Sequence, residues 1–102
     1  MLTFNLKKEW FEKIKSGEKT HEYRLFNKYW CNRIFNARHK CTLELRPFIV
    51  CFACGYPKKD DKEKRLYAHI IDIDTKMAMF TDLEELGSKT VYDIEFELLE
   101  AE

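Results

Sequence analysis

The chain has 102 residues, a length typical of a single domain, and 45% of them are hydrophobic, which is enough for one modest core. Eighteen lysines and arginines balance eighteen aspartates and glutamates, which argues against long, non-specific binding to nucleic acid through overall charge. The composition also excludes a wholly disordered chain. We therefore expect one domain over residues 1–102, with any nucleic-acid binding confined to a local patch.

No apolar run reaches the roughly 18–20 residues that cross a bilayer. The opening residues MLTFNLKKEW lack the basic-then-apolar order of a signal peptide. We therefore expect a cytoplasmic protein with no membrane partner, whose four cysteines are reduced thiols.

The first part of the chain predicts a strand, a helix and a second strand. LTFNL (2–6) alternates apolar and polar residues, which is typical of a half-buried strand. Residues 7–17 place apolar side chains at helical spacing, and Gly17 stands where a left-handed helix end favours glycine. The chain then enters a strand over residues 19–25.

The middle of the chain is less regular. Residues 27–36 fit either a short helix or a turn held by aromatic side chains. Residues 41–53 begin with alternating leucines and polar residues and predict a strand, in which Pro47 marks an edge, a bulge or a break. The charged segment 54–65 predicts a mobile hairpin tip, and residues 65–74 predict a further strand.

The last part predicts a short helix and a strand. Thr81 followed by Glu84 is a capping-box pattern, so a helix is expected over residues 81–86 with its end at Gly87. Residues 90–99 alternate apolar and acidic side chains as a half-buried strand does. Because no regular strand–helix–strand rhythm is present, we expect an α+β domain with a mainly antiparallel sheet that curls into a small β-barrel with flanking helices.

Charged groups gather in GEKTHEYR, residues 17–24, where the first helix gives way to a strand. Strand alternation puts Thr20, Glu22 and Arg24 on one face, and a bend at the helix end can turn the amine of Lys19 toward Glu22. Such a group can hold a phosphate or the donor and acceptor edge of a base. The same residues also fit an internal ion pair beside a solvated lysine.

This stretch resembles the ASCH family, whose signature GxKxxExR is matched by Gly17, Lys19, Glu22 and Arg24. The preceding helix EWFEKIKSG and the final strand VYDIEFEL match as well, so the resemblance spans nearly the whole chain. It implies a PUA-like fold, a small distorted β-barrel with helices at its side and a cleft floored by the motif. It also implies that the protein binds RNA or a nucleotide there.

Some ASCH proteins are enzymes: one branch removes the acetyl group from acetylated cytidine, and another has been described as a ribonuclease. The amidohydrolase branch uses the motif lysine, a threonine at the position held here by Glu22, and a glutamate before the last helix. Lys19 matches, but position 22 carries a carboxylate and residues 74–83 hold no glutamate. A hydrolase acting on RNA or a modified nucleoside is thus the alternative, with Lys19 and Glu22 as candidate catalytic groups.

Further residues are candidates for the same cleft. Trp30 or its neighbour Tyr29 is expected either to stack on a base or to pack in the core. Arg46 and Tyr56 are also expected to line the cleft. The basic run Arg33, Arg38, His39 and Lys40 predicts either an extended phosphate track or a solvated loop.

Cys51 and Cys54 form a CxxC pair, yet a structural zinc site needs four ligands, usually from two such pairs. Only Cys41 and His39 lie near in sequence, so buried, inert thiols are the favoured reading and neither metal nor cofactor is predicted. A protein-binding adaptor remains a third functional hypothesis beside the binding protein and the enzyme.

Overall fold

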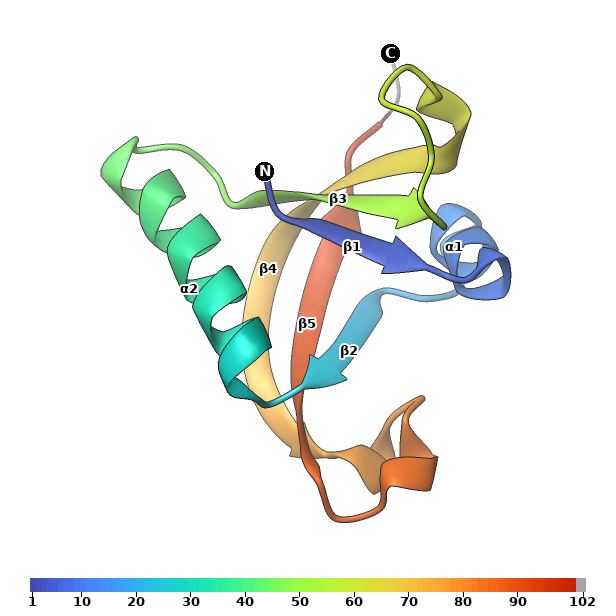
Figure 1. The fold of residues 1–102 in the computed structure, drawn as a ribbon, viewed down its shortest axis with the longest axis vertical. Coiled ribbons are helices and arrows are strands. Elements are labelled where there is room, and N and C mark those ends of the chain that lie inside the picture. The colour runs from blue at the N-terminus through green and yellow to red at the C-terminus, as the bar shows by residue number, and fades with distance from the viewer. Residues whose placement is uncertain (101–102) are drawn as a thin grey trace.

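The computed structural model describes residues 1–100 as an α+β fold, with a five-stranded sheet and two α-helices (Figure 1). The strands are β1 (Thr3–Leu6), β2 (His21–Leu25), β3 (Ile49–Cys54), β4 (Arg65–Met77) and β5 (Thr90–Leu98). The helices are α1 (Lys8–Lys15) and α2 (Lys28–Leu43), and short 3-10 turns form η1 (Lys62–Lys64), η2 (Ala78–Phe80) and η3 (Glu84–Leu86). Within residues 1–100, neither α-helix is both long and apolar enough to cross a lipid bilayer.

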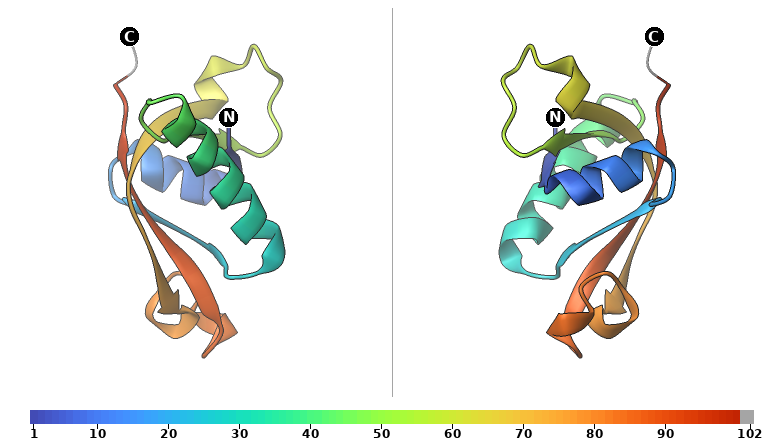
Figure 2. Two further views of the ribbon diagram at one scale, coloured as in Figure 1. Left: turned by 90° about the vertical axis from the view of Figure 1, so that its left-hand side faces the viewer. Right: turned by 90° about the vertical axis from the view of Figure 1, so that its right-hand side faces the viewer.

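The sheet is mostly antiparallel, as the sequence predicts, and its strand order is β1-β3-β4-β5-β2. Only the β1–β3 pair is parallel among the described strands. The long strands β4 and β5 curve past both helices (Figure 2), and a register shift at Ile70/Asp72 interrupts their ladder. No ladder joins β1 to β2 within residues 1–100, so the sheet is open and the closed barrel expected from the sequence is not seen.

One hydrophobic core joins the sheet to both helices. Phe52 lies between Phe4 and Phe96, with ring centroids 5.7 and 4.6 Å away. Phe11 of α1 and Ile34 of α2 are buried against the same cluster. Burying each such side chain contributes roughly 1.5–3 kcal/mol, so this cluster fixes the helices that border the motif.

Helix α2 is longer than the sequence indicated. Asn27 caps it, because its side-chain oxygen accepts a hydrogen bond from the Trp30 N–H at 2.9 Å. The helix continues to Leu43, so the strand expected from residue 41 was wrong at its start, and β3 begins only at Ile49. The leucine alternation was misleading because Leu43 and Leu45 are both exposed and report no buried strand face.

The segment between β4 and β5 also differs from its prediction. The helix expected over residues 81–86 is reduced to the single turn η3. Thr81 does not cap that turn; its hydroxyl accepts a hydrogen bond from the Leu83 N–H at 3.1 Å. Gly87 ends the turn as predicted, at φ +61°. This segment positions Asp82 beside the motif.

Candidate functional site

The end of helix α1 presents Lys19 to the strand that follows it. Gly17 adopts φ +85°, a left-handed conformation that favours glycine, and its N–H donates to the Ile14 carbonyl at 3.0 Å. The Lys19 N–H then donates to the Lys13 carbonyl at 3.0 Å. Gly17 therefore acts through the backbone turn, and it does not line the cleft formed by the other motif residues.

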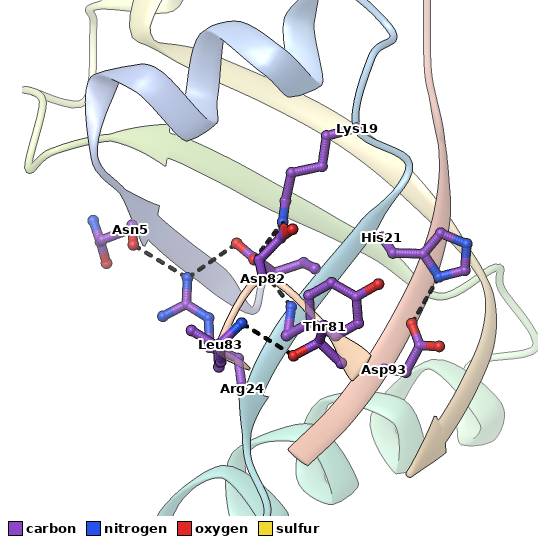
Figure 3. A network of polar contacts seen from close by, with 10 residues as sticks. Asn5, Lys19, His21, Arg24, Thr81, Asp82, Leu83 and Asp93 are labelled. Carbon is purple, nitrogen blue, oxygen red and sulfur yellow. Dashed lines mark hydrogen bonds and ion pairs between the residues drawn. The ribbon is translucent and has the colours of Figure 1, made fainter. Parts of the chain in front are cut away.

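Asp82 and the three charged side chains of the motif form a chain of four groups, in the order Asp82, Lys19, Glu22, Arg24. The Lys19 amine lies 3.6 Å from Glu22 Oε1 and also pairs with the Asp82 carboxylate. Glu22 Oε2 lies 3.3 Å from Arg24 Nη2. Figure 3 shows Lys19 and Asp82 directed toward each other beside Arg24. The predicted bend of Lys19 toward Glu22 is confirmed, and the two acids and two bases balance.

Glu22 is the buried centre of this chain, with only 6% of its surface exposed. Its Oε1 also accepts the backbone N–H of Tyr23 at 3.0 Å. A buried carboxylate is tolerated only where cations and hydrogen-bond donors surround it, and both are present here. Glu22 is thus a fixed acceptor rather than a mobile surface group.

Arg24 connects the two edge strands of the open sheet. From β2, its Nη2 donates to the carbonyl oxygen of Asn5 on β1 at 3.2 Å (Figure 3). Its guanidinium carbon lies 5.1 Å from the ring centroid of Phe4 and 4.9 Å from that of Trp30. The glutamate, the carbonyl and the two rings together hold the guanidinium plane in one orientation.

These groups floor a cleft of about 590 Å³. The Lys19 amine lies 5.0 Å from the ring centroid of Trp10 and 5.1 Å from that of Tyr23, so aromatic rings border the cationic end of the cleft. The charged residues that line it are Lys7, Glu9, Lys19, Glu22, Arg24, Asp82 and Glu85. Acids and bases are therefore nearly balanced, and the cleft carries no strong positive field.

The other residues expected to bind a ligand are placed differently. Trp30 lines the cleft, but its ring packs against Phe4 with centroids 5.4 Å apart and carries Arg24 as well, so core packing dominates its role. Arg46 lies outside this cleft and pairs with Glu44. Tyr56 also lies outside it, in the β3–β4 loop, and is 92% exposed.

Asp82 is a charged site residue that the sequence did not indicate, and Trp10 and Tyr23 are aromatic cleft residues that were also not predicted. Asp82 lies 63 positions from Lys19 in the chain, in the segment between β4 and β5. Its neighbours Thr81 and Glu84 resembled a helix cap, so Asp82 was assigned no role of its own. Only the path of the chain after β4 brings this carboxylate to the motif, and local sequence carries no signal for that path.

A second polar cluster lies around His21 of β2, next to the motif cleft. Strand alternation directs His21 and Tyr23 away from Glu22, yet the Tyr23 ring reaches Lys19 and borders both the cleft and this cluster. His21 Nδ1 lies 2.7 Å from Asp93 Oδ1 (Figure 3), and the Lys76 amine lies 2.6 Å from Asp93 Oδ2. Burial raises the pKa of Asp93, but the hydrogen bonds from Lys76 and His21 outweigh it and hold the pKa below its usual value. Burial, together with Asp93 and Asp82, raises the pKa of Tyr23.

The cleft suits a flat polar ligand, because aromatic side chains stand beside fixed donors and acceptors. Lysine and arginine supply donors, and Glu22 supplies a buried acceptor beside them. Comparisons with known proteins found no match: no family model, no curated protein and no solved structure matches the chain.

Proposed function

We propose that this chain is an ASCH-type protein with a PUA-like fold that binds RNA or a nucleotide in the cleft of the GxKxxExR motif. The observation that carries the proposal is that Lys19, Glu22 and Arg24 meet on the floor of one cleft, with the rings of Trp10 and Tyr23 beside them. A structural ion pair alone does not require an adjoining cleft with aromatic walls.

The contacts favour a separate role for each charged group. Glu22 orients Arg24 and offers an acceptor to an exocyclic amine of a base. Lys19 contacts a phosphate, but Asp82 already pairs with its amine, so a ligand phosphate has to replace that carboxylate. Asp82 thus serves as an internal anion that competes with the ligand for Lys19.

A hydrolase acting on RNA or a modified nucleoside, such as acetylated cytidine, is the second candidate, and the Lys19–Asp82 contact favours it. The amidohydrolase branch of the family uses a carboxylate from the segment before the last helix, and here Asp82 of that segment reaches the motif lysine. In this candidate, the Glu22 carboxylate acts as the base that activates a water molecule, and the Lys19 ammonium, paired with Glu22 and Asp82, stabilises negative charge that develops on the substrate. The threonine hydroxyl that this branch has at position 22 is still replaced by the carboxylate of Glu22.

The test measures binding of a fluorescein-labelled single-stranded RNA of about ten nucleotides by fluorescence anisotropy, at about 50 and about 200 mM salt. Lys19→Ala and Glu22→Gln are expected to weaken binding, and Asp82→Asn is expected to tighten it because Lys19 is freed. Lys15→Ala removes the same charge from an exposed position outside the cleft and is the matched control.

Equal affinities for Lys19→Ala, Glu22→Gln and Lys15→Ala would contradict the proposed binding site. The hydrolase is tested in the same samples, by electrophoresis for shortened RNA and by mass spectrometry for acetate released from acetylated cytidine. If product forms with the wild type but not with Lys19→Ala or Asp82→Asn, the hydrolase is favoured over a protein that only binds its ligand. Absence of product at high protein concentration would exclude hydrolysis of these substrates.

A further inference from the structure

A second concave surface lies between helix α2, the two residues that precede β1 and the start of β3, apart from the motif cleft. This groove has a volume of about 290 Å³. Leu2, Cys41 and Phe48 supply apolar lining, and Arg33, Lys40 and Arg46 supply the charged lining. No carboxylate side chain among the described residues lines the groove, whereas four line the motif cleft.

Two of the three cations in the groove are free to bind an anion. Arg46 pairs with the nearby Glu44. Arg33 and Lys40 take part in no ion pair with any residue of the described chain, and they lie seven positions apart on α2, which places them on the same side of the helix. The Arg33 guanidinium is steadied by a hydrogen bond from its Nη1 to the Tyr29 hydroxyl at 2.7 Å.

Positive charge is concentrated in helix α2. The helix sequence KYWCNRIFNARHKCTL holds four lysines and arginines and no acid, which is a formal charge of +4. Because the chain is neutral, the remaining residues carry 14 basic and 18 acidic side chains, a formal charge of −4. The neutral total therefore conceals a basic helix, and two of its four cations, Arg33 and Lys40, line the groove.

The groove and the motif cleft are joined through Trp30. Its ring lies in the cleft under Arg24, and the guanidinium carbon of Arg33 lies 5.3 Å from the same ring centroid. Along α2, Trp30 and Lys40 are ten positions apart, which is about 15 Å at 1.5 Å per residue. A strand that enters the cleft can therefore continue along α2 over Arg33 to Lys40.

We propose that this groove is a phosphate-binding subsite for single-stranded RNA, in which Arg33 and Lys40 contact the backbone of a strand whose base or phosphate occupies the motif cleft. The proposal rests on the proposed function for the occupant of the cleft. Affinity for the RNA backbone then comes mainly from α2, and the nearly neutral cleft recognises the base or phosphate that enters it. The basic run lies on helix α2 and not in a loop; Arg33 and Lys40 of that run line the groove, whereas Arg38 and His39 border another surface.

The test compares the double variant Arg33→Gln/Lys40→Gln with Lys58→Gln/Lys59→Gln, which removes two exposed charges from the β3–β4 loop. Binding of the labelled RNA of about ten nucleotides is followed by anisotropy across a salt series. The α2 variant is expected to lose at least about tenfold in affinity at low salt, and its plot of log affinity against log salt should flatten by about 1.4, or 0.7 for each phosphate. The loop variant should stay within about twofold of the wild type.

Equal affinities and salt slopes for the α2 and loop variants would overturn the subsite. If Lys19→Ala abolishes RNA binding while the α2 variant retains it, the motif cleft stands and the groove fails. If the α2 variant loses binding while Lys19→Ala retains it, the groove stands and the cleft fails. A wild-type protein that binds no RNA overturns the groove and leaves only a nucleotide as the ligand of the cleft. Thermal unfolding of each variant shows whether it is folded at the assay temperature, so that a loss of affinity is not mistaken for a loss of structure.

Discussion

Replacing Glu22 with alanine is expected to destabilise the folded protein by about 3 kcal/mol. The substitution removes a buried carboxylate that accepts from the Tyr23 N–H at 3.0 Å and lies 3.3 Å from Arg24 Nη2 and 3.6 Å from the Lys19 amine. Removing one partner of a buried ion pair typically costs about 3–5 kcal/mol, because the remaining charge is left uncompensated.

The lower end of that range applies for two reasons. Lys19 keeps Asp82 as a partner, and the side chain of Arg24 is 20% exposed and keeps the carbonyl of Asn5. For a chain of this length, 3 kcal/mol lowers the melting temperature by about 12–24 °C, at about 4–8 °C per kcal/mol. Glu22→Gln retains an oxygen for the Tyr23 N–H and is expected to cost about half as much.

The assay is urea unfolding followed by the fluorescence of the two tryptophans, both of which line the cleft. An unchanged dependence of the free energy of unfolding on urea shows that the variant changes stability and not the unfolded state. If Glu22→Ala lowers the free energy of unfolding by less than about 1 kcal/mol, Glu22 contributes no more than an exposed ion pair does, and its role as a buried charged centre would be wrong.

Three further predictions follow from the same contacts. The pKa of Asp93 lies below its ordinary value of about 3.9, so its ionised form stabilises the fold above that pH and the contribution is lost as the pH falls through the lowered pKa. Asp93→Asn should therefore be less stable at neutral pH and lose less stability on acidification, and equal acid profiles from urea midpoints would contradict this. Gly17→Ala should lower the stability of the fold by about 1 kcal/mol, because residue 17 adopts φ +85°, and it should leave RNA affinity unchanged. An unchanged melting temperature would contradict the expected strain at this turn. Ellman's reagent should modify exposed Cys31 in the native protein but buried Cys51 only after unfolding; rapid native modification of a Cys51-only variant would contradict its burial.

The fold could be predicted from the sequence where side-chain periodicity and burial agree. In β5, the alternation of apolar and acidic residues matches the burial of Ile94 and Phe96. In residues 41–46 the alternation is equally clean, yet Leu43 and Leu45 are exposed and the chain completes helix α2 there. Short alternating patterns cannot distinguish a strand from a helix end, because both place leucine beside polar residues.

The site could be predicted only where its residues are close in sequence. The Lys19, Glu22 and Arg24 cluster follows from a turn at Gly17 and the two-residue period of a strand. Asp82 could not be found in this way, because it reaches Lys19 through the fold and across 63 positions. The separation of Arg46 from the cleft had the same origin, since the extra turns of α2 carry that residue to another surface.

Binding of RNA or a nucleotide in the motif cleft can be measured residue by residue with nitrogen-15 nuclear magnetic resonance, in which the protein is titrated with short single-stranded RNA and, separately, with nucleotides. A ligand in the cleft should cause saturable shifts of the amide signals of residues 22–25 and 82–86 and of the Trp10 indole signal. Lys19→Ala should weaken these shifts. Cleft signals that do not shift at saturating ligand, or shifts confined to other surfaces, would show that the motif cleft does not bind these ligands.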